Sequence, residues 1–486
     1  MLRATPRTGI RPPPRQSRPE SPCVSDTSIA RAPGEGAASQ TDPQTTSSQR
    51  PAFESGASSP AGTRSPADRD DGSPDGCSED RSRDRLGDGA RAASADDGGS
   101  GAGGAERFEN SLVVRAVTGG RDARIDVFRG LALAMIYINH VPQTIYDEIT
   151  SRNFGFSDAA ELFVFLSGTS AGLAYSRYFR SGPLWPGLSR IWGRAWTLYL
   201  VHLFILVWVL ALAAAVARWG GDPDMLWRDN MQYFGIDPTA FLMGLPSLTH
   251  QLGYVNILPL YIVLLLIAPL PIIAGLRAPW LTILGSGIVW AVCDQFRINL
   301  PNFPTPGGWF FNPLAWQFLF TIGLMTGIAL KDGRRLVPRH PALIGLSGAI
   351  VLGALLWMKW KTLGYAANSG LRWLAQHGAP YWVRNFDKTF LAVPRLVHIL
   401  AAAYFFSALP IVRRICGSPW LRFFDVLGRH ALPVFAAGTL LSFAARAVRE
   451  LTPPSLLLDT ALIAAGLLAL WLLAEIYDRV RMARAK

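Results

Sequence analysis

The sequence predicts an all-α polytopic membrane protein with about ten transmembrane helices and with both termini in the cytoplasm. Of its 486 residues, 50% are hydrophobic and only 17% are charged, whereas soluble proteins carry about 25% charged residues. From Arg121 onward, long apolar runs alternate with short polar breaks. These runs approach the ~20 residues of a membrane-spanning helix and exceed the ~9–11 residues of a barrel strand.

The chain divides into two parts of different composition. Residues 1–110 are rich in Ser, Pro, Gly, Asp and Arg and poor in aromatic and β-branched residues. Such a segment buries too little apolar surface to fold, so we expect a disordered tail and no signal peptide. Residues 111–486 are expected to form the transmembrane domain. The four cysteines lack metal or redox spacing, so we expect neither a disulfide nor a metal site.

Ten apolar segments of the second part are expected to span the membrane. Several of them contain proline or glycine, so their ends are approximate. The expected spans are, in chain order, residues 125–142, 158–177, 191–217, 252–273, 279–296, 312–330, 341–358, 391–410, 430–447 and 456–476.

Lys and Arg residues mark one side of the expected bundle. They cluster before the first span, in alternate loops and at the C-terminus, whereas the first loop has only Arg152 and the fifth only Arg297. Cytoplasmic loops carry such an excess, so both termini are expected in the cytoplasm. The 359–390 loop is basic too, but long loops cross regardless of charge. This topological role explains the net charge of +12 without a nucleic-acid partner.

A histidine lies near the end of the first span, in "RGLALAMIYINHVPQ". His140 follows Arg124 by sixteen residues, a helical rise of about 24 Å, so we expect it near the non-cytoplasmic side. The second span opens with "NFGFSDAAELFVFLSG". Asp158 and Glu161 share one face of that helix, and Ser157 is its predicted N-cap. One histidine and two carboxylates are therefore expected at the same depth.

Ionisable groups inside a membrane are costly and commonly functional. Two interpretations of His140 have equal weight from chemistry alone. In the first, a histidine–carboxylate pair only joins two helices. In the second, Asp158 or Glu161 orients the imidazole, which acts as a general base and takes a proton from an attacking hydroxyl. The nearby small residues from Ser167 to Ala174 are interpreted as a close helix contact.

Charged residues also lie at the opposite end of the first three spans. Asp126 and Arg129 stand in "RIDVFRG", and Arg190 and Arg194 open the third span in "RIWGRAWTLYL". Positive-inside anchoring explains most such arginines. The functional alternative is a phosphate-binding cluster for a cytoplasmic cofactor.

Other polar residues are weaker candidates. Asn139, Asn256 and Tyr261 are expected to line an acceptor cavity, or only to bridge helices. For His202 and His398, a structural histidine with satisfied hydrogen bonds is the simpler interpretation. The aromatic run 309–311 suits an interfacial belt better than a sugar-stacking platform.

Two paired motifs carry a resemblance to a known family. "RIDVFRGLALAMIYINHVP" and "NFGFSDAAELFVFLSG", with the weaker "RIWGRAWTLYLVHL" and "FFDVLGRHALPVFAAGTLLSF", resemble the OpgC family of the acyltransferase-3 group. The resemblance covers the chain from about Arg121 to the C-terminus. "DVFRG" stands where the broader group commonly has "DGLRG", which favours the OpgC branch.

The resemblance implies a function as well as a fold. It implies a multi-pass enzyme of the bacterial inner membrane, surrounded by lipid. The enzyme would transfer an acyl group, succinyl in this family, from cytoplasmic acyl-CoA to hydroxyls of a periplasmic glucan. His140 would be essential, and Arg190 and Arg194 would bind the donor.

Several alternatives stay open at this point. The acyl group could pass directly to the sugar or first to His140. A polytopic transporter or exporter of a glucan is a rival function, because spans interrupted by Gly and Pro occur in transporters. "DVFRG...IN" also resembles the heparan α-glucosaminide acetyltransferases, a second family of transmembrane acylating enzymes.

Overall fold

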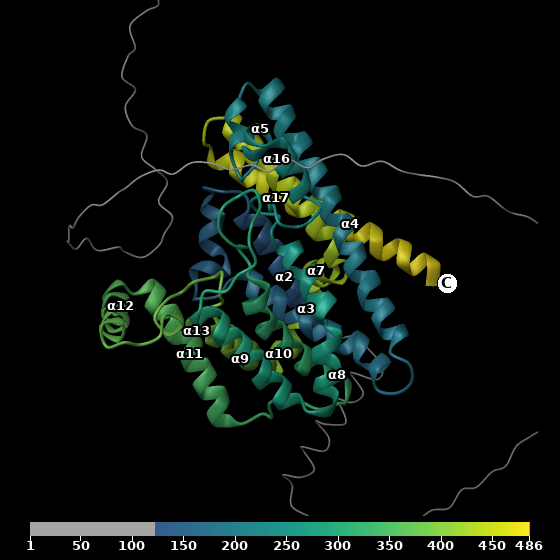
Figure 1. The fold of residues 1–486 in the computed structure, drawn as a ribbon, viewed down its shortest axis with the longest axis vertical. Coiled ribbons are helices and arrows are strands. Elements are labelled where there is room, and N and C mark those ends of the chain that lie inside the picture. Colours follow the sequence, from purple (N-terminus) through teal and green to yellow (C-terminus); the bar gives the residue numbers. More distant parts are fainter. Residues whose placement is uncertain (1–121, 486) are drawn as a thin grey trace, which may run out of the picture. The chain divides into compact units, whose positions relative to one another are not determined.

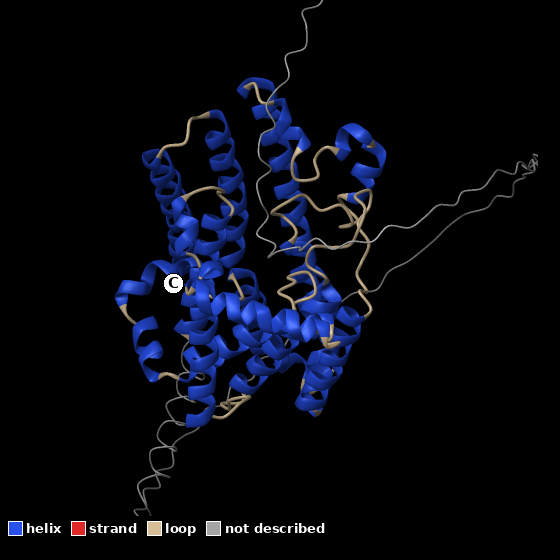
Figure 2. Cartoon of the chain, turned by 90° about the vertical axis from the view of Figure 1, so that its left-hand side faces the viewer, coloured by secondary structure: helices blue, strands red, loops and turns tan. Residues whose placement is uncertain are grey.

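The structure is a computed structural model that describes residues 122–485, and these residues form a helical bundle without a named strand. The bundle is drawn in Figures 1 and 2. The predicted disordered tail, residues 1–110, and the first eleven residues of the predicted transmembrane domain lie outside the described residues.

Each of the ten apolar segments predicted from the sequence contains helix. The corresponding helices are α2 (Ala123–Asn139), α3 (Ala159–Tyr175), α4 (Trp185–Ala215), α7 (Ile257–Ile267) with α8 (Pro269–Arg277), α9 (Pro279–Gln295), α10 (Pro313–Lys331), α11 (Pro341–Lys359), α13 (Val393–Ala408), α16 (Ala431–Leu451) and α17 (Leu456–Ala485). Further helices connect them: α5 (Tyr233–Ile236), α6 (Pro238–Gly244), α12 (Lys361–Gln376), α14 (Pro410–Cys416) and α15 (Arg422–Arg429).

The chain is a helical membrane protein, although fewer helices qualify as full spans than the ten expected. Within the described residues, five helices are long and apolar enough to cross a membrane, namely α4 with its π-helical extension, α10, α11, α16 and α17. The number rises to seven if each bent pair, α7/α8 at 48° and α13/α14 at 81°, counts as one span. Helices α2, α3 and α9 have 17 residues each, fewer than the ~20 of a perpendicular span. The ten-span count and the orientation stay predictions.

Two helix pairs pack so closely that only glycine fits between them. Helix α2 lies against α15, and α3 against α10. A side-chain carbon on Gly130 or Gly428 would overlap backbone of the facing helix in the first pair, and the same holds for Gly168 in the second. The small residues of the second predicted span therefore do form a close helix contact. Helix α2 also packs directly against α3, and the site lies at the junction of these two helices.

Candidate active site

His140 caps the C-terminal end of α2. Its backbone N–H donates to the carbonyl oxygens of Ile136 and Tyr137, at 3.1 and 3.2 Å. Its ring packs edge-on against the ring of Tyr254, with centroids 4.8 Å apart. The Nδ1 atom is buried and has no hydrogen-bond partner among the described residues, and the same is true of the side-chain oxygen of Asn139. Backbone and packing thus hold the imidazole, and its Nδ1 makes no hydrogen bond to the described residues.

Asp158 and Glu161 begin α3 and form its capping box. Asp158 is the N-cap and accepts from the N–H of Ala160 at 2.8 Å. Glu161 accepts from the backbone N–H of Asp158 at 2.9 Å. The prediction of Ser157 as the N-cap was wrong, because the Ser157 hydroxyl lies 2.6 Å from Nδ1 of His398 instead.

The two carboxylates are bound by two cations from a distant part of the chain. The Lys388 ammonium lies 2.5 Å from Asp158. The Arg395 guanidinium lies 2.6 Å from Glu161 and 3.3 Å from Asp158. We call these four residues the ion-pair quartet. The Glu161 side chain is fully buried, so its charge needs this pairing to offset the cost of desolvation.

The structure places both carboxylates on these cations and not on the imidazole. In the described part of the chain, no hydrogen bond joins His140 to Asp158 or Glu161. The ring still lies within electrostatic range of Lys388 and Asp158. Any influence of the carboxylates on His140 therefore acts through Lys388 or through space.

A pocket of about 460 Å³ with a mixed polar and apolar wall lies close to this junction. Gly253 and Asn256 in its wall stand on either side of Tyr254 in the chain, and Thr389 follows Lys388. The pocket is therefore next to the residues that surround His140. The rest of its lining is mostly amide and aromatic: Asn230, Gln251, Arg297, Asn299, Asn302, Gly308, Trp309, Phe310 and Phe390.

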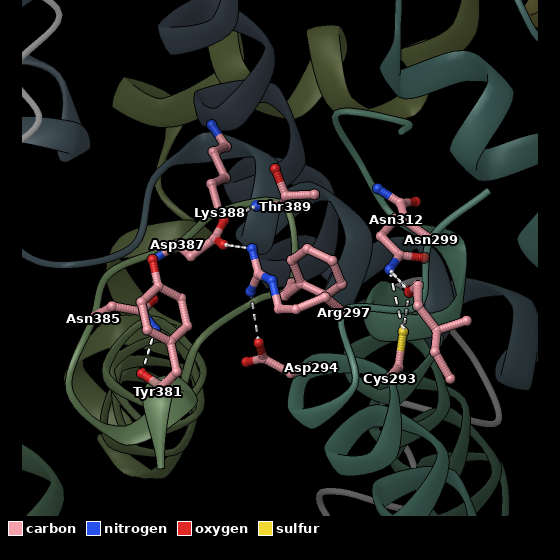
Figure 3. Close-up of polar contacts among 12 residues, drawn as sticks. Cys293, Asp294, Arg297, Asn299, Asn312, Tyr381, Asn385, Asp387, Lys388 and Thr389 are labelled. Atoms are coloured by element: carbon pink, nitrogen blue, oxygen red, sulfur yellow. Dashed lines mark hydrogen bonds and ion pairs between the residues drawn. The ribbon is translucent and has the colours of Figure 1, made fainter. Parts of the chain in front are cut away.

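Arg297 contributes the one charged side chain among the residues that line this pocket, and its charge is already paired (Figure 3). Its guanidinium lies 2.9 Å from Asp294 and 2.8 Å from Asp387. It also stacks over the Phe390 ring at 3.7 Å. Burial alone would lower the pKa of Arg297, but the pairing with Asp387 and Asp294 outweighs burial and raises this pKa. The guanidinium is a fixed, neutralised part of the wall.

In the first turns of α2, at the opposite end of that helix from His140, Asp126 and Arg129 are engaged inside the bundle. They form a buried ion pair of 3.0 Å. Arg129 also donates to the carbonyl oxygen of Gly428 at 3.2 Å and to the hydroxyl of Ser170. The structure thus gives these two predicted cofactor-binding residues a place in the packing of α2 against α3 and α15.

Arg190 and Arg194 are more accessible. Both lie in the first turns of α4, and the Arg190 guanidinium lies 4.7 Å from the Tyr178 ring, which Arg177 also contacts at 4.6 Å. Neither Arg190 nor Arg194 has an ion-pair partner among the described residues. Arginines with free donors in a partly exposed cluster are suited to binding phosphate groups.

The remaining candidates fall in different places. Asn256 lines the pocket. Tyr261 does not, and its ring packs edge-on against Phe320 at 6.2 Å. At His398, Nδ1 lies 2.6 Å from the Ser157 hydroxyl, but Nε2 is buried without a partner among the described residues, so the expectation of a satisfied histidine holds for only one of its nitrogens. The expectation of a satisfied histidine was wrong for His202, which is fully buried in α4 with both ring nitrogens unpartnered within the described region.

Sequence interpretation missed the two cations of the quartet and Arg297. A signal for Lys388 was present, because the basic residues of the 359–390 loop run against the positive-inside trend. The structure gives Lys388 a partner in Asp158, which explains a basic residue on this side of the bundle.

Comparison with known proteins identifies a family to which the chain is similar. A family model described as "OpgC protein" matches residues 121–482. Nothing among the curated proteins and nothing among the solved structures matches the chain.

Proposed function

The chain belongs to the OpgC family, and on this premise we propose that it is an integral-membrane O-acyltransferase. It would move a succinyl group from cytoplasmic succinyl-CoA to a hydroxyl of a periplasmic glucan. The observation that carries this proposal is the position of His140. Its buried Nδ1 is unpartnered within the described residues, and its neighbour Tyr254 stands in the chain between two residues of the pocket wall, Gly253 and Asn256. The bacterial inner membrane is the proposed location.

His140 is the proposed general base. It takes the proton of the acceptor hydroxyl while the hydroxyl oxygen attacks the thioester carbonyl carbon. The carbon–sulfur bond then breaks, and the departing CoA thiolate accepts the proton from the imidazolium. In the alternative two-step route, the acyl group passes first to His140 and then to the sugar.

The ion-pair quartet is proposed to support this chemistry from outside the reacting atoms. Lys388 lies within electrostatic range of the His140 ring. Asp158 binds the Lys388 ammonium and is itself bound by Arg395, so these ion pairs fix the position of the ammonium. Lys388 is paired with Asp158, but an ammonium has three N–H donors, and a donor directed at the carbonyl oxygen would stabilise the negative charge that develops there. Asp158 and Glu161 are thus proposed as positioning residues.

The donor is proposed to bind at the opposite end of α3, with Arg190 and Arg194 holding the CoA phosphates. Helix α3 has 17 residues and is therefore about 25 Å long. The extended pantetheine arm would pass between helices along this length and bring the thioester to His140. This arrangement separates a cytoplasmic donor from a periplasmic acceptor, with both termini of the chain in the cytoplasm.

A deletion strain tests the proposal against transport. Mass spectrometry of periplasmic and extracellular glucans would measure acyl content and abundance separately. We expect loss of acyl groups with normal glucan abundance, restored by the wild-type gene and not by His140→Ala. Loss of glucan from the outside, with acylation intact, would favour an exporter, a function compatible with the bent pairs α7/α8 and α13/α14.

A further inference from the structure

Several residues that line the pocket beside Tyr254 have side chains that are fixed by one hydrogen bond while another polar atom of the wall has no partner among the described residues. The side-chain amides of Gln251, Asn299 and Asn302 each donate to a backbone carbonyl, at 3.3, 2.9 and 2.7 Å. Their carbonyl oxygens, and the indole N–H of Trp309, have no hydrogen-bond partner among the described residues. Three buried acceptors and one buried donor without partners therefore belong to residues of a single pocket wall, and a ligand with several hydroxyl groups would satisfy them.

An exposed aromatic ring completes this wall. Phe310 lines the pocket and is 47% exposed, and its ring is held edge-on against Phe311 with centroids 4.8 Å apart. A pyranose ring has a face of C–H groups and a rim of hydroxyls. Phe310 can cover the first while the amides bind the second, which is the mixture of apolar and polar lining found in small-ligand sites.

The charge of the pocket selects against anions. Arg297 is paired with two carboxylates, Asp294 and Asp387, so its single positive charge is more than balanced. A site for an anion would present guanidinium donors that are free, as Arg190 does at the other end of the bundle. The pocket therefore suits a neutral ligand.

We infer that this pocket is a subsite for one neutral, unsubstituted pyranose ring of the acceptor, next to the ring that is acylated at His140. The inference rests on the proposed function and specifies its acceptor. A ring that already carries a charged acyl group would bring a carboxylate to a wall whose one cation, Arg297, is already balanced by Asp294 and Asp387, and it would be excluded. The enzyme itself would then limit how densely the glucan becomes acylated.

Equilibrium binding in nanodiscs, without donor, tests the subsite. The full-length protein is titrated calorimetrically with a neutral gluco-oligosaccharide and with the same oligosaccharide after chemical succinylation. We expect the succinylated ligand to bind at least about tenfold more weakly, and Phe310→Ala and Asn256→Ala each to weaken binding of the neutral ligand by about tenfold. The control is Phe296→Ala, which removes a ring that is 71% exposed and lies outside the pocket wall.

A second variant tests the charge argument by a gain of binding. Asp387→Asn keeps a side chain of the same shape but removes one of the two negative charges that are paired with Arg297. It should bring the affinity for the succinylated ligand close to that for the neutral one. Equal affinity of the wild-type protein for both ligands, no binding of either, or wild-type binding by both Phe310→Ala and Asn256→Ala would overturn the subsite.

The failure of the subsite can be distinguished from the failure of the proposed function. Acyl transfer is measured with the same preparations. Transfer by Phe310→Ala and Asn256→Ala with an unchanged KM for glucan would reject the subsite and leave the acyltransferase intact. Binding through the pocket without any transfer by the wild-type protein would reject the acyltransferase and keep the subsite.

Discussion

His140 and the ion-pair quartet are held by different forces, and this difference decides what each can do. The His140 side chain is held by packing against Tyr254, and its Nδ1 makes no hydrogen bond to the described residues. The members of the quartet are fixed by several charge-assisted contacts of 2.5–3.3 Å. A nitrogen without a hydrogen bond to the protein, such as Nδ1 of His140, can exchange a proton with a ligand. Side chains fixed by several ion pairs, such as those of the quartet, can hold other groups in position.

Removing the negative charge of Glu161, the fully buried member of the quartet, should destabilise the protein. In Glu161→Gln, the fully buried side chain would no longer neutralise Arg395, and breaking such a pair costs about 3–5 kcal/mol. Asp158→Asn should cost less, because this side chain is partly exposed and asparagine is also a good N-cap.

The apparent Tm in detergent measures both effects. The matched control is Asp332→Asn, which breaks the more exposed pair with Arg180 and should change stability by about 0–1 kcal/mol. An apparent Tm of Glu161→Gln as high as that of the control would show that Arg395 does not depend on this carboxylate.

Replacing both Arg190 and Arg194 with Gln should weaken acyl-CoA binding. Each charge-assisted contact to a phosphate is worth about 1.5–3 kcal/mol, which corresponds to at least about a tenfold rise in Kd for each arginine. Binding of acyl-CoA to purified protein in detergent measures this change.

Arg218 provides a control on the same segment of chain. It lies in the π-helical turn that extends the other end of α4 and is exposed. Arg218→Gln should leave the donor Kd unchanged. If the double variant at Arg190 and Arg194 also bound acyl-CoA like wild type, these two arginines would have only a topological role.

Residue identities alone could predict where His140 and the carboxylates lie, but not which groups they contact. The rise per residue along a helix placed His140 at the end of one span and Asp158 at the start of the next, and this placement depends only on positions that are close in the sequence. Lys388 reaches Asp158 across 230 residues of sequence, and Arg129 reaches the carbonyl of Gly428 across 299. Such contacts are decided by tertiary packing, so Arg129 was assigned to a cofactor site from its charge.

At the scale of elements, glycine contacts hold α2 against α15 and therefore hold the His140 helix in place. Gly428→Ala would drive a methyl group into the carbonyl oxygen of Asp126. Overpacking of this kind costs about 1–3 kcal/mol, and the displaced α2 should also lower acyl transfer. Apparent Tm and transfer rate measure the two consequences.

Gly285→Ala is the matched control for this substitution. Gly285 lies in α9, and an added side-chain carbon there meets no atom within 4 Å. Because alanine favours helix by about 1 kcal/mol over glycine, this variant should be neutral or slightly more stable. Loss of stability in both variants, or in neither, would show that the close α2–α15 contact is not what matters.

The long apolar helices were predictable because length and hydrophobicity are local properties of the sequence. Two other features were not. The 252–273 segment is broken at Ala268 into α7 and α8 with a bend of 48°, where Pro269 removes a backbone donor. Helix α12 was missed because it is amphipathic and not uniformly apolar, so a search for apolar runs passes over it.

At the scale of the whole molecule, activity should reside in the residues that the family match covers. Removal of residues 1–110, a segment predicted from composition to lack a packed core, should leave membrane insertion and acyl transfer unchanged. Membrane fractionation and a transfer assay of the truncated protein check this. A truncated protein that inserts but does not acylate would assign the tail a role in the reaction.

The proposed role of His140 is to catalyse acyl transfer from acyl-CoA on one side of the membrane to glucan on the other. Acyl transfer in sealed vesicles tests this role most directly. Purified protein is reconstituted with acyl-CoA inside and glucan outside, and the acyl groups on the glucan are measured for the wild type and for His140→Ala. Positioned acid–base groups contribute about 10²–10⁴-fold, so the variant should transfer at least about a hundredfold more slowly while it inserts and binds acyl-CoA normally. Transfer by His140→Ala at nearly the wild-type rate would contradict the account and leave His140 a residue that only joins helices.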